Sequence, residues 1–317
     1  MKYTFLIPAY KVRFFEEALK SILNQTYKDF KVVVSDDCSP DDIKSITYKY
    51  IEDQRLSYRR NKENIGSHSL VAHWNLLVDL CDTDYLILAS DDDVYDEHFL
   101  EEVDFLVGKY PEVDLIHARA NLIDENSNTY SKDALYEEKV SLLDYLSQFN
   151  FYNHIECVAN QVFKTKALKE RGGFVDFPLA WCSDAATAAA IAVNGVANSH
   201  NILFSFRMSG ENISSINNIK DVIWKKYEAL NMYDDFMKKI FDKIILDGTK
   251  FQSRTMHQIR DCHKNLIYGT SISCLGVMTL FDFFKYIKTY KHKGYISNNK
   301  ECLKLFIKWT LAKLKFN

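Results

Sequence analysis

Short runs of β-forming residues alternate with segments of helical periodicity over the first 118 residues. The runs expected to be strands are 3–8, 30–35, 56–60, 85–89 and 113–118, and the segments expected to be helices are 14–25, 41–51, 67–81 and 96–109. Strands that alternate with helices of this length form βαβ units, in which a largely parallel sheet is covered on both faces. The sequence therefore predicts an α/β fold with a mixed, mostly parallel sheet flanked by helices.

The pattern changes after about residue 217, which suggests a second region. A helix is expected at 184–194 and a late strand at 202–207, and beyond these the β-forming runs give way to long helical stretches with lysine-rich faces. A chain of 317 residues has room for one large α/β domain and an appendage. We predict a catalytic domain over 1–216, with a nucleotide-sugar half over 1–110 and an acceptor half over 111–216, followed by a basic helical region over 217–317.

The net charge of −3 conceals an acidic first part and a basic last part. From Lys220 onward there are 19 lysines and arginines against 9 acidic residues, and from Lys285 the lysines alternate with leucine, isoleucine, phenylalanine and tryptophan. This composition favours a basic amphipathic helix at a membrane surface, and the alternative is a solvated helix docked on its own domain. The uncharged stretch 265–281 is shorter than the about 20 residues of a membrane span and is interpreted as a buried or interfacial helix.

Several protein classes lack their usual signature in this sequence. The ten glycines contain neither the dinucleotide-binding nor the P-loop pattern, and the seven irregularly spaced cysteines include no Cys-x-x-Cys. The chain opens on a strand-like run rather than a signal peptide, so we expect a cytosolic, reducing location.

Acidic residues follow two of the expected strands. Asp36 and Asp37 end the second strand, and the triplet Asp91, Asp92 and Asp93 follows the apolar run 85–89. Because ligands bind at the carboxyl ends of parallel strands, these acids should converge on one edge. Three consecutive aspartates beside a buried strand repel one another, and a hard divalent cation relieves that repulsion. A plain acidic loop is the alternative.

The motifs that carry this chemistry also resemble a known family. The segments are Ile7-Pro8-Ala9-Tyr10, Gln25-Thr26-Tyr27-Lys28-Asp29-Phe30, Asp36-Asp37-Cys38-Ser39, Ser90-Asp91-Asp92-Asp93, Gly172-Gly173-Phe174, Ser183-Asp184, and Arg207 with Ser214. Together they resemble the inverting family-2 glycosyltransferases of GT-A fold over roughly residues 3–215. The resemblance is strongest in the first hundred residues.

The resemblance implies a role for each matching residue. A nucleotide would be held by Pro8, Ala9, Tyr10, Asp36, Asp37 and Asp91, with Tyr10 stacking on the base and Asp37 accepting from its imide. A Mn²⁺ or Mg²⁺ ion would be bound by Asp92 and Asp93. Asp184 would be the general base, and Arg207 would contact the acceptor. The sequence departs from the family pattern at Ser90, Ser183 and Ser209, where the family usually has an acid, an acid and a histidine.

Three further residues are candidates from their positions alone. Trp181 could form an apolar platform for an acceptor sugar, or be plain core. His154 precedes a strand-like run and could face the acceptor, or sit in a satisfied loop. Asn64 lies in a loop that leads into a helix, where it could help hold phosphates or simply form a polar turn.

These observations lead to a metal-dependent inverting glycosyltransferase as the main hypothesis. Its donor would be a nucleotide-diphosphate sugar, expected to be a UDP-sugar. Its acceptor would be a hydroxyl of a glycan or lipid-linked glycan in bacterial surface polysaccharide synthesis, at the inner face of the cell membrane. A sugar-1-phosphate nucleotidyltransferase is disfavoured, because no glycine-rich basic loop follows the first strand. A non-catalytic nucleotide-sugar binder or membrane scaffold is the remaining alternative.

Overall fold

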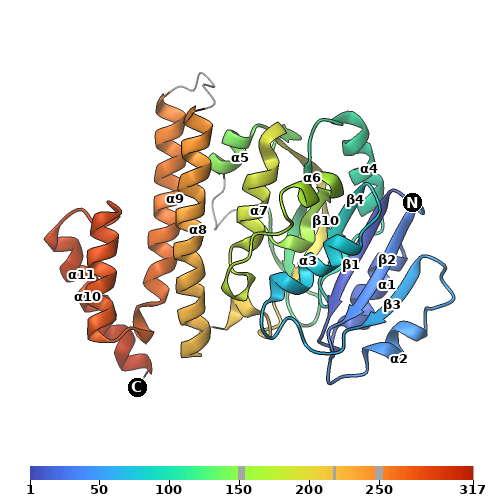
Figure 1. Cartoon of the computed structure of the whole chain (residues 1–317), viewed down its shortest axis with the longest axis horizontal. Coiled ribbons are helices and arrows are strands. Elements are labelled where there is room, and N and C mark those ends of the chain that lie inside the picture. The colour runs from blue at the N-terminus through green and yellow to red at the C-terminus, as the bar shows by residue number, and fades with distance from the viewer. Residues whose placement is uncertain (149–153, 217–218, 247–252, 317) are drawn as a thin grey trace. The chain divides into compact units, whose positions relative to one another are not determined.

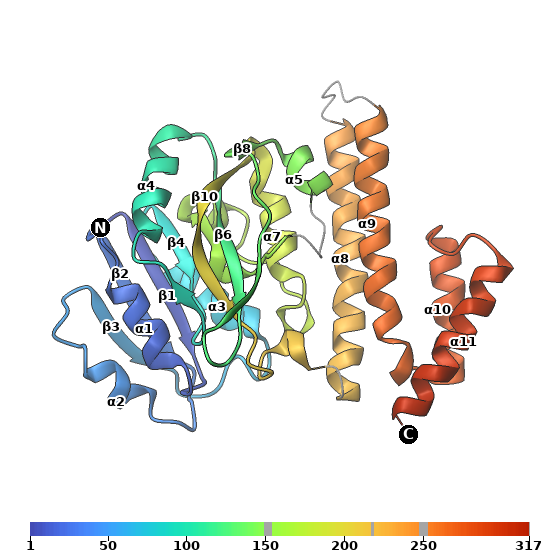
Figure 2. The ribbon, with the colours of Figure 1, turned by 180° about the vertical axis from the view of Figure 1, so that it is seen from behind.

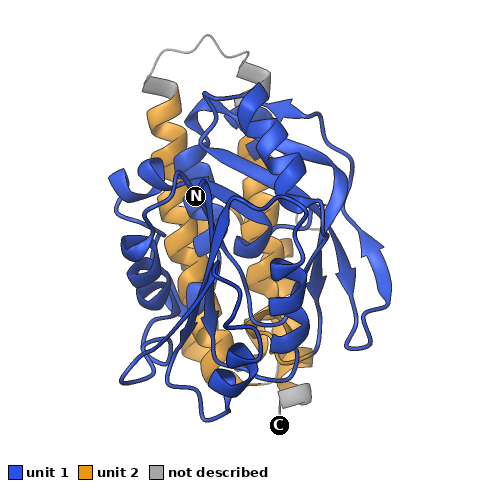
Figure 3. Ribbon diagram, turned by 90° about the vertical axis from the view of Figure 1, so that its right-hand side faces the viewer, with its two compact units in different colours: residues 1–209 blue, residues 210–317 orange. Residues whose placement is uncertain are grey.

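A computed structural model of the chain describes residues 1–148, 154–216, 219–246 and 253–316. The chain divides into two compact units, residues 1–209 and 210–317 (Figure 3). We expected the change of structure near residue 216, seven residues later. Each unit is described below on its own.

Unit 1 is built on a ten-stranded mixed sheet, as the alternating sequence pattern predicted. The strand order is β3-β2-β1-β4-β9-β6-β10-β5, with β7 paired to β6 and β8 paired to β10. The strands are β1 (Tyr3–Ala9), β2 (Phe30–Asp36), β3 (Leu56–Arg60), β4 (Tyr85–Leu88), β5 (Val94–Tyr95), β6 (Leu115–Ile123), β7 (Thr129–Lys132), β8 (Lys139–Val140), β9 (Gln161–Lys164) and β10 (Val196–Arg207).

The first four strands of this order are parallel, and β4 is the innermost of them. Every residue of β4 is buried, which is the continuous apolar run expected of a parallel strand covered on both faces. Farther along the sheet, β9 runs antiparallel to both of its neighbours, β4 and β6. The parallel strands β3 to β4 are therefore joined to β6 and β10 through one reversed strand.

Helices cover both faces of the sheet (Figures 1 and 2). Alternation along β1 directs Tyr3, Phe5 and Ile7 into the core that also contains Phe15 of α1 and Phe99 of α4. On the other face, α3 contacts β1 and α6 contacts β9. The helices of unit 1 are α1 (Phe15–Leu23), α2 (Ile43–Tyr48), α3 (Leu70–Leu80), α4 (Phe99–Lys109), α5 (Leu142–Gln148), α6 (Thr165–Glu170) and α7 (Ser183–Ile191).

Side-chain caps explain why two helices begin later than their sequence pattern suggested. Asp42 accepts a hydrogen bond from the backbone N–H of Ser45 at 2.9 Å, so α2 begins at Ile43 rather than near residue 41. Ser69 caps α3 in the same way by accepting from Ala72 at 3.0 Å. The capping side chains stand outside the helices that they terminate.

Unit 2 is helical over the residues that the structure describes, as expected for the basic region. Its helices are α8 (Lys220–Leu246), α9 (Ser253–Ser273), α10 (Leu280–His292) and α11 (Asn299–Phe316). None of its described helices, nor any in unit 1, combines the length and apolarity that a membrane crossing needs. The uncharged stretch 265–281 forms the end of α9, a short connection and the start of α10.

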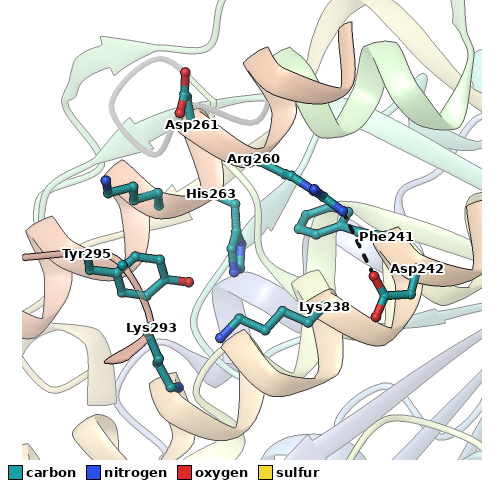
Figure 4. Close-up of a pocket in the computed structure, with 10 residues that line it drawn as sticks. Lys238, Phe241, Asp242, Arg260, Asp261, His263, Lys293 and Tyr295 are labelled. Atoms are coloured by element: carbon teal, nitrogen blue, oxygen red, sulfur yellow. Dashed lines mark ion pairs between the residues drawn. The ribbon is translucent and has the colours of Figure 1, made fainter. Parts of the chain in front are cut away.

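A buried carboxylate ties the helices of unit 2 together. Asp234 on α8 is fully buried and accepts hydrogen bonds from His263 of α9 at 3.0 Å and from Tyr295 at 2.5 Å. Lys238 and Lys293 lie 2.9 and 2.6 Å from its other oxygen. Figure 4 shows these four partners around a cavity of about 280 Å³. Burial alone would raise the pKa of Asp234, but the four partners outweigh it and hold the pKa well below its usual range.

Replacing Asp234 with Asn should destabilise unit 2 by about 3–5 kcal/mol, because Lys293 and Lys238 lose a buried partner. Thermal unfolding measures the loss. Asp235→Asn is the matched control, since this neighbouring carboxylate is 64% exposed and its ion pairs should be worth no more than about 1 kcal/mol.

Because the folded pKa of Asp234 is depressed, the stability that Asp234 contributes is complete above the pKa of the unfolded state and is lost as the pH falls through the pKa of the folded state. The difference between wild type and Asp234→Asn should therefore shrink in acid, and a constant difference would contradict the assignment.

Candidate active site

The acids that follow β2 and β4 do meet at one edge of the sheet. Register places Ala9 of β1 opposite Asp36 of β2, and β4 lies on the other side of β1. Hydrogen bonds then join the three strand ends: the Ser39 hydroxyl donates to the Tyr10 carbonyl at 2.5 Å, and the Tyr10 N–H donates to Asp91 at 2.9 Å. The convergence predicted from topology is therefore confirmed.

Asp91 and Asp92 share one ammonium group. Asp91 accepts from the backbone N–H of Lys11 at 2.7 Å, and the Lys11 Nζ lies 2.8 Å from Asp92 Oδ2. Burial raises the pKa of Asp91, and the Lys11 charge opposes that shift. Burial also opposes the charge of Lys11, but Asp92 and Asp91 together raise its pKa. The loop after β1 is thus fastened to the aspartate triplet by both backbone and side chain.

Ser90 organises the other two carboxyl groups. Its hydroxyl lies 3.0 Å from Asp92 Oδ1 and 2.5 Å from Asp93 Oδ2. Asp93 also accepts from the backbone N–H of Arg207 at 2.8 Å and is 1% exposed. Burial, and then the charge of Asp92, raise the pKa of Asp93 well above its usual range. A serine at the position where the family usually has an acid therefore positions the acids that remain.

The donor set of this cluster fits a hard divalent cation. Three carboxyl groups and a hydroxyl supply only oxygen ligands, the chemistry that Mg²⁺ and Mn²⁺ prefer. Both oxygens of Asp93 are engaged, by Ser90 and by the Arg207 backbone, and both oxygens of Asp92 are engaged by Ser90 and Lys11. The assignment of a metal ion to Asp92, as principal ligand, and to Asp93 stays a prediction.

The residues expected to hold the nucleotide differ in their exposure to solvent. Tyr10 is 41% exposed at the sheet edge, beside the half-buried Pro8 and the buried Ala9. Asp37 is 3% exposed and accepts from Asn61 and from the backbone of Ile65 and Gly66, at 2.7–3.0 Å. A Cβ on Gly66 would lie 2.9 Å from Asp37 Oδ2, so glycine permits this close approach.

Asn64 belongs to the same loop but turns to a local partner. Its side-chain oxygen accepts from the Ser67 N–H at 2.8 Å, which closes a turn before α3.

Asp36 is fully buried, and its carboxylate accepts from the Ser39 N–H at 2.8 Å, the Tyr58 hydroxyl at 2.7 Å and the Arg60 guanidinium. The nucleotide contact expected of Asp36 is therefore corrected to a structural tie between β2 and β3.

The Arg207 side chain lies inside the protein rather than at an open surface. It is fully buried, and its guanidinium donates to the Asp92 carbonyl at 2.8 Å, to Glu17 at 2.7 Å and to the Ser127 hydroxyl at 3.0 Å. The guanidinium also lies 4.3 Å from the centre of the Phe14 ring. Bound in this way, the Arg207 guanidinium positions the backbone of the aspartate triplet. This structural role takes the place of the acceptor contact expected for the residue.

His154 is likewise buried. Its side chain is 5% exposed, stacks on His117 with ring centres 4.5 Å apart, and hydrogen-bonds Glu156 at 3.1 Å. Glu156 also accepts from Tyr145 and Gln161, each at 2.7 Å. The acceptor contact expected of His154 is therefore wrong for its ring.

Asp184 opens α7 after an unusual turn. Leu179, Ala180 and Cys182 all have left-handed φ angles, between 54° and 64°, although none is glycine. Such strain costs of order 1–3 kcal/mol per residue and clusters at functional sites. Asp184 and the half-buried Trp181 flank the last residue of this turn, and their roles as base and acceptor platform stay predictions.

The environment of Asp184 suits proton transfer. Burial raises the pKa of Asp184 to about 7, and the charge of Glu156 adds to the shift. Burial raises the pKa of Glu156 to about 7 as well. The charges of both Asp93 and Asp184 contribute to the raised pKa of the half-buried Cys157, so the aspartate triplet and Asp184 lie within electrostatic reach of the same thiol.

Sequence reasoning missed several members of this arrangement. Lys11 directly follows β1 at the ligand edge, a position that could have drawn attention to it. The sequence places Glu156 beside His154 as a residue that could also face the acceptor, but only the folded chain brings it near Asp184. A separate cavity of about 670 Å³, lined by Lys2, Asp82 and Lys164 among others, contains none of the predicted site residues.

Curated relatives match about half of the chain. An uncharacterized glycosyltransferase of Methanocaldococcus jannaschii is 26% identical over 160 residues, which cover 50% of this chain and 53% of the relative. Protein CgeD of Bacillus subtilis is 21% identical over 148 residues, or 45% of this chain and 35% of CgeD. The chain thus matches about half or less of the length of these relatives.

Solved structures share the fold over most of the chain. S. aureus TarS 1-349 in complex with UDP-GlcNAc gives a TM-score of 0.59 at 16% identity and covers 93% of this chain and 89% of TarS 1-349. Mannosyltransferase PcManGT from Pyrobaculum calidifontis, in complex with GDP-Man and Mn²⁺, gives 0.54 at 16% identity, with 99% and 86% covered. The sequence pattern described as Glycosyl transferase family 2 matches residues 4–172, more than half of the chain. The chain belongs to glycosyl transferase family 2.

Proposed function

We propose that the protein transfers a sugar from a nucleotide-diphosphate donor to an acceptor hydroxyl, in one displacement that inverts the anomeric carbon. The observation that carries the proposal is the meeting of three strand ends around Tyr10, Asp91 and Asp92, with Asp184 as a carboxyl group of raised pKa in the same unit. Family membership and the nucleotide-sugar complexes of TarS and PcManGT support it.

The donor would bind at the edge formed by β1, β2 and β4. The exposed ring of Tyr10 offers a stacking surface for the base, beside Asp37 and its loop. Asp92 would hold Mn²⁺ or Mg²⁺, which when bound supplies charge neutralisation for the diphosphate. The Lys11 ammonium stands next to Asp92 and can neutralise the same group. A UDP-sugar is the donor we propose first, with GDP-sugars and dTDP-sugars as competitors in the test.

Asp184 would receive the proton of the acceptor hydroxyl. As that oxygen bonds to the anomeric carbon, the bond from carbon to the diphosphate oxygen breaks, and the nucleotide diphosphate leaves with the electron pair. A base of pKa about 7 is well matched to this task near neutral pH. Trp181 offers the apolar surface on which an acceptor sugar could lie. The product from an α-linked donor would be β-linked.

Asp184→Asn should lower transfer by about 10²–10⁴-fold, because the amide cannot accept the proton. It should leave donor binding intact, measured as the metal-dependent rise in melting temperature with each nucleotide sugar.

In wild type, kcat/KM should fall as the pH drops below about 7, since the carboxyl group of Asp184 must lose its proton to act as a base. Asp92→Asn should instead lose the metal-dependent stabilisation by the donor.

Glu170→Gln provides the control for these two variants, because Glu170 is exposed on α6 and has only a loose pair with Lys166. Its transfer rate and donor binding should match wild type. Wild-type protein that binds a nucleotide sugar but transfers it to no glycan or lipid-linked acceptor would favour the non-catalytic alternative. Wild-type protein that no nucleotide sugar stabilises in the presence of Mn²⁺ would overturn the donor assignment.

We further propose that unit 2 contacts the cytosolic face of a membrane, where a lipid-linked acceptor of surface polysaccharide synthesis would be found. On α11, Leu303, Ile307, Leu311 and Leu314 recur at helical spacing and are 51–73% exposed. Phe306 and Trp309 pack instead against Phe283 of α10, with ring centres 5.9 and 5.3 Å apart. Lysines accompany the exposed apolar side chains, as expected of a helix lying on anionic lipid.

Changing Ile307, Leu311 and Leu314 together to Asn should weaken binding to vesicles that contain phosphatidylglycerol by at least about tenfold, because each side chain is worth about 1–2 kcal/mol when buried in lipid. Co-sedimentation with the vesicles measures the change. Phe105→Asn removes an apolar side chain of similar exposure from unit 1 and should leave binding unchanged. Equal sedimentation of wild type and the triple variant would refute the membrane contact.

A further inference from the structure

A lysine side chain lies against the carboxylates to which a metal ion is assigned. The Lys11 Nζ lies 2.8 Å from Asp92 Oδ2 and 3.8 Å from Asp91 Oδ1. The side chains of Asp91 and Asp92 are 7% and 6% exposed, so water does little to stabilise their negative charge. Two buried carboxylates side by side need a cation, and the Lys11 ammonium is one that the chain itself supplies.

The backbone of Lys11 is fixed, whereas its side chain reaches solvent. The Lys11 N–H donates to Asp91 Oδ2 at 2.7 Å, and the Tyr10 N–H donates to the same oxygen at 2.9 Å. The side chain of Lys11 is 36% exposed, in contrast to the buried acids that it contacts. Because a lysine head group stands on a flexible four-carbon stem, the ammonium can leave Asp92 while the loop stays in place.

The two partners of Asp92 differ in what they do to an approaching metal ion. Asp92 Oδ1 lies 3.0 Å from the Ser90 hydroxyl, and Oδ2 lies against the Lys11 ammonium. A hydroxyl is neutral and has lone pairs that Mg²⁺ or Mn²⁺ can use, whereas an ammonium has no lone pair and repels a cation. An ion bound through Oδ2 must replace the ammonium, and an ion bound through Oδ1 is repelled by it across the width of one carboxylate.

We propose that Lys11 is an internal counter-ion that competes with the metal ion for Asp92 and turns to the donor diphosphate when it is displaced. The inference rests on the metal and donor assignments of the proposed function. Without a donor, metal binding breaks the ion pair between Lys11 and Asp92 and leaves two cations close together. When metal and donor bind together, the diphosphate stabilises both positive charges. Lys11 therefore makes metal binding depend on the donor.

A second lysine in unit 1 provides a matched ion pair. The Lys31 Nζ lies 2.7 Å from Asp82 Oδ1, and the Lys31 side chain is 37% exposed, close to the values for Lys11. Lys31 stands near the start of β2, whereas the ligand edge lies at the end of that strand. Replacing Lys31 thus removes the same charge without touching the aspartate triplet.

Binding of Mn²⁺ to the full chain in the absence of nucleotide tests the competition. Electron paramagnetic resonance of the unbound ion gives the dissociation constant. Lys11→Met keeps much of the side-chain length but loses the charge, so it should bind Mn²⁺ at least about tenfold more tightly than wild type. Lys11→Arg and Lys31→Met should bind Mn²⁺ as wild type does. Adding Asp92→Asn to Lys11→Met should abolish the gain, which places the ion at Asp92.

Binding of the nucleotide should change in the opposite direction. Calorimetric titration with UDP, GDP and dTDP at saturating Mn²⁺ identifies the diphosphate that wild type binds most tightly. Lys11→Met should bind that nucleotide about tenfold more weakly, because no ammonium is left to contact the diphosphate. General damage to the fold would weaken the binding of both ligands. A gain for the metal together with a loss for the nucleotide therefore separates displacement of Lys11 from misfolding.

The remaining outcomes would overturn the inference in distinguishable ways. Equal or weaker binding of Mn²⁺ by Lys11→Met would refute the competition and leave the metal assignment in place. Tighter binding of Mn²⁺ with unchanged nucleotide affinity would refute the turn of Lys11 to the diphosphate. If neither wild type nor Lys11→Met binds Mn²⁺, the metal assignment fails and this inference fails with it. Glycosyl transfer by the same wild-type sample then decides separately whether the proposed reaction holds.

Discussion

The site depends on buried negative charge that the backbone brings together at one edge of a sheet. Register alone sets β1 between β2 and β4, so the acids that follow the two outer strands must face the loop after the central one. Asp91 accepts hydrogen bonds from two backbone N–H groups of that loop, and the Lys11 ammonium lies close enough to balance part of its negative charge. Neither the loop nor the triplet could keep its position without the other, because each satisfies groups that burial would leave unpaired.

A layer of positioning residues lies beneath the groups that would meet ligands. Arg207 holds the Asp92 carbonyl and Glu17, Ser90 bridges Asp92 and Asp93, and Asp36 locks β2 to β3 through Tyr58 and Arg60. Such residues look like ligand contacts in a sequence, since arginine and aspartate at strand ends are typical of both roles. Only burial and hydrogen bonding distinguish a positioning residue from a ligand contact. A fully buried guanidinium whose N–H groups are already engaged cannot also bind a sugar.

Local sequence pattern predicted the parallel strands β1 to β4 well and the rest of the sheet less well. The spacing of apolar residues and the acidic residues at strand ends were sufficient to predict β1 to β4 and the edge where they end. The contacts at that edge follow directly from the parallel order of the strands. The strands β5, β7 and β8 have two to four residues each and carry no periodic signal. The cluster around Glu156 and His154 arises from long-range packing between β6, β7 and the chain before β9, which no single stretch of sequence encodes. The left-handed turn before Asp184 uses leucine, alanine and cysteine, and these residues give no hint of such a backbone.

The reversed strand β9 has an evolutionary consequence. Between β6 and β9 the chain adds β7 beside β6 and β8 beside β10, and β9 then enters the sheet between β6 and β4. Residues can be added to or removed from that connection without changing the order of β1, β2 and β4. Length changes there would therefore leave the edge that carries Tyr10, Asp37 and Asp92 in place, as expected where loops are mounted on a rigid scaffold.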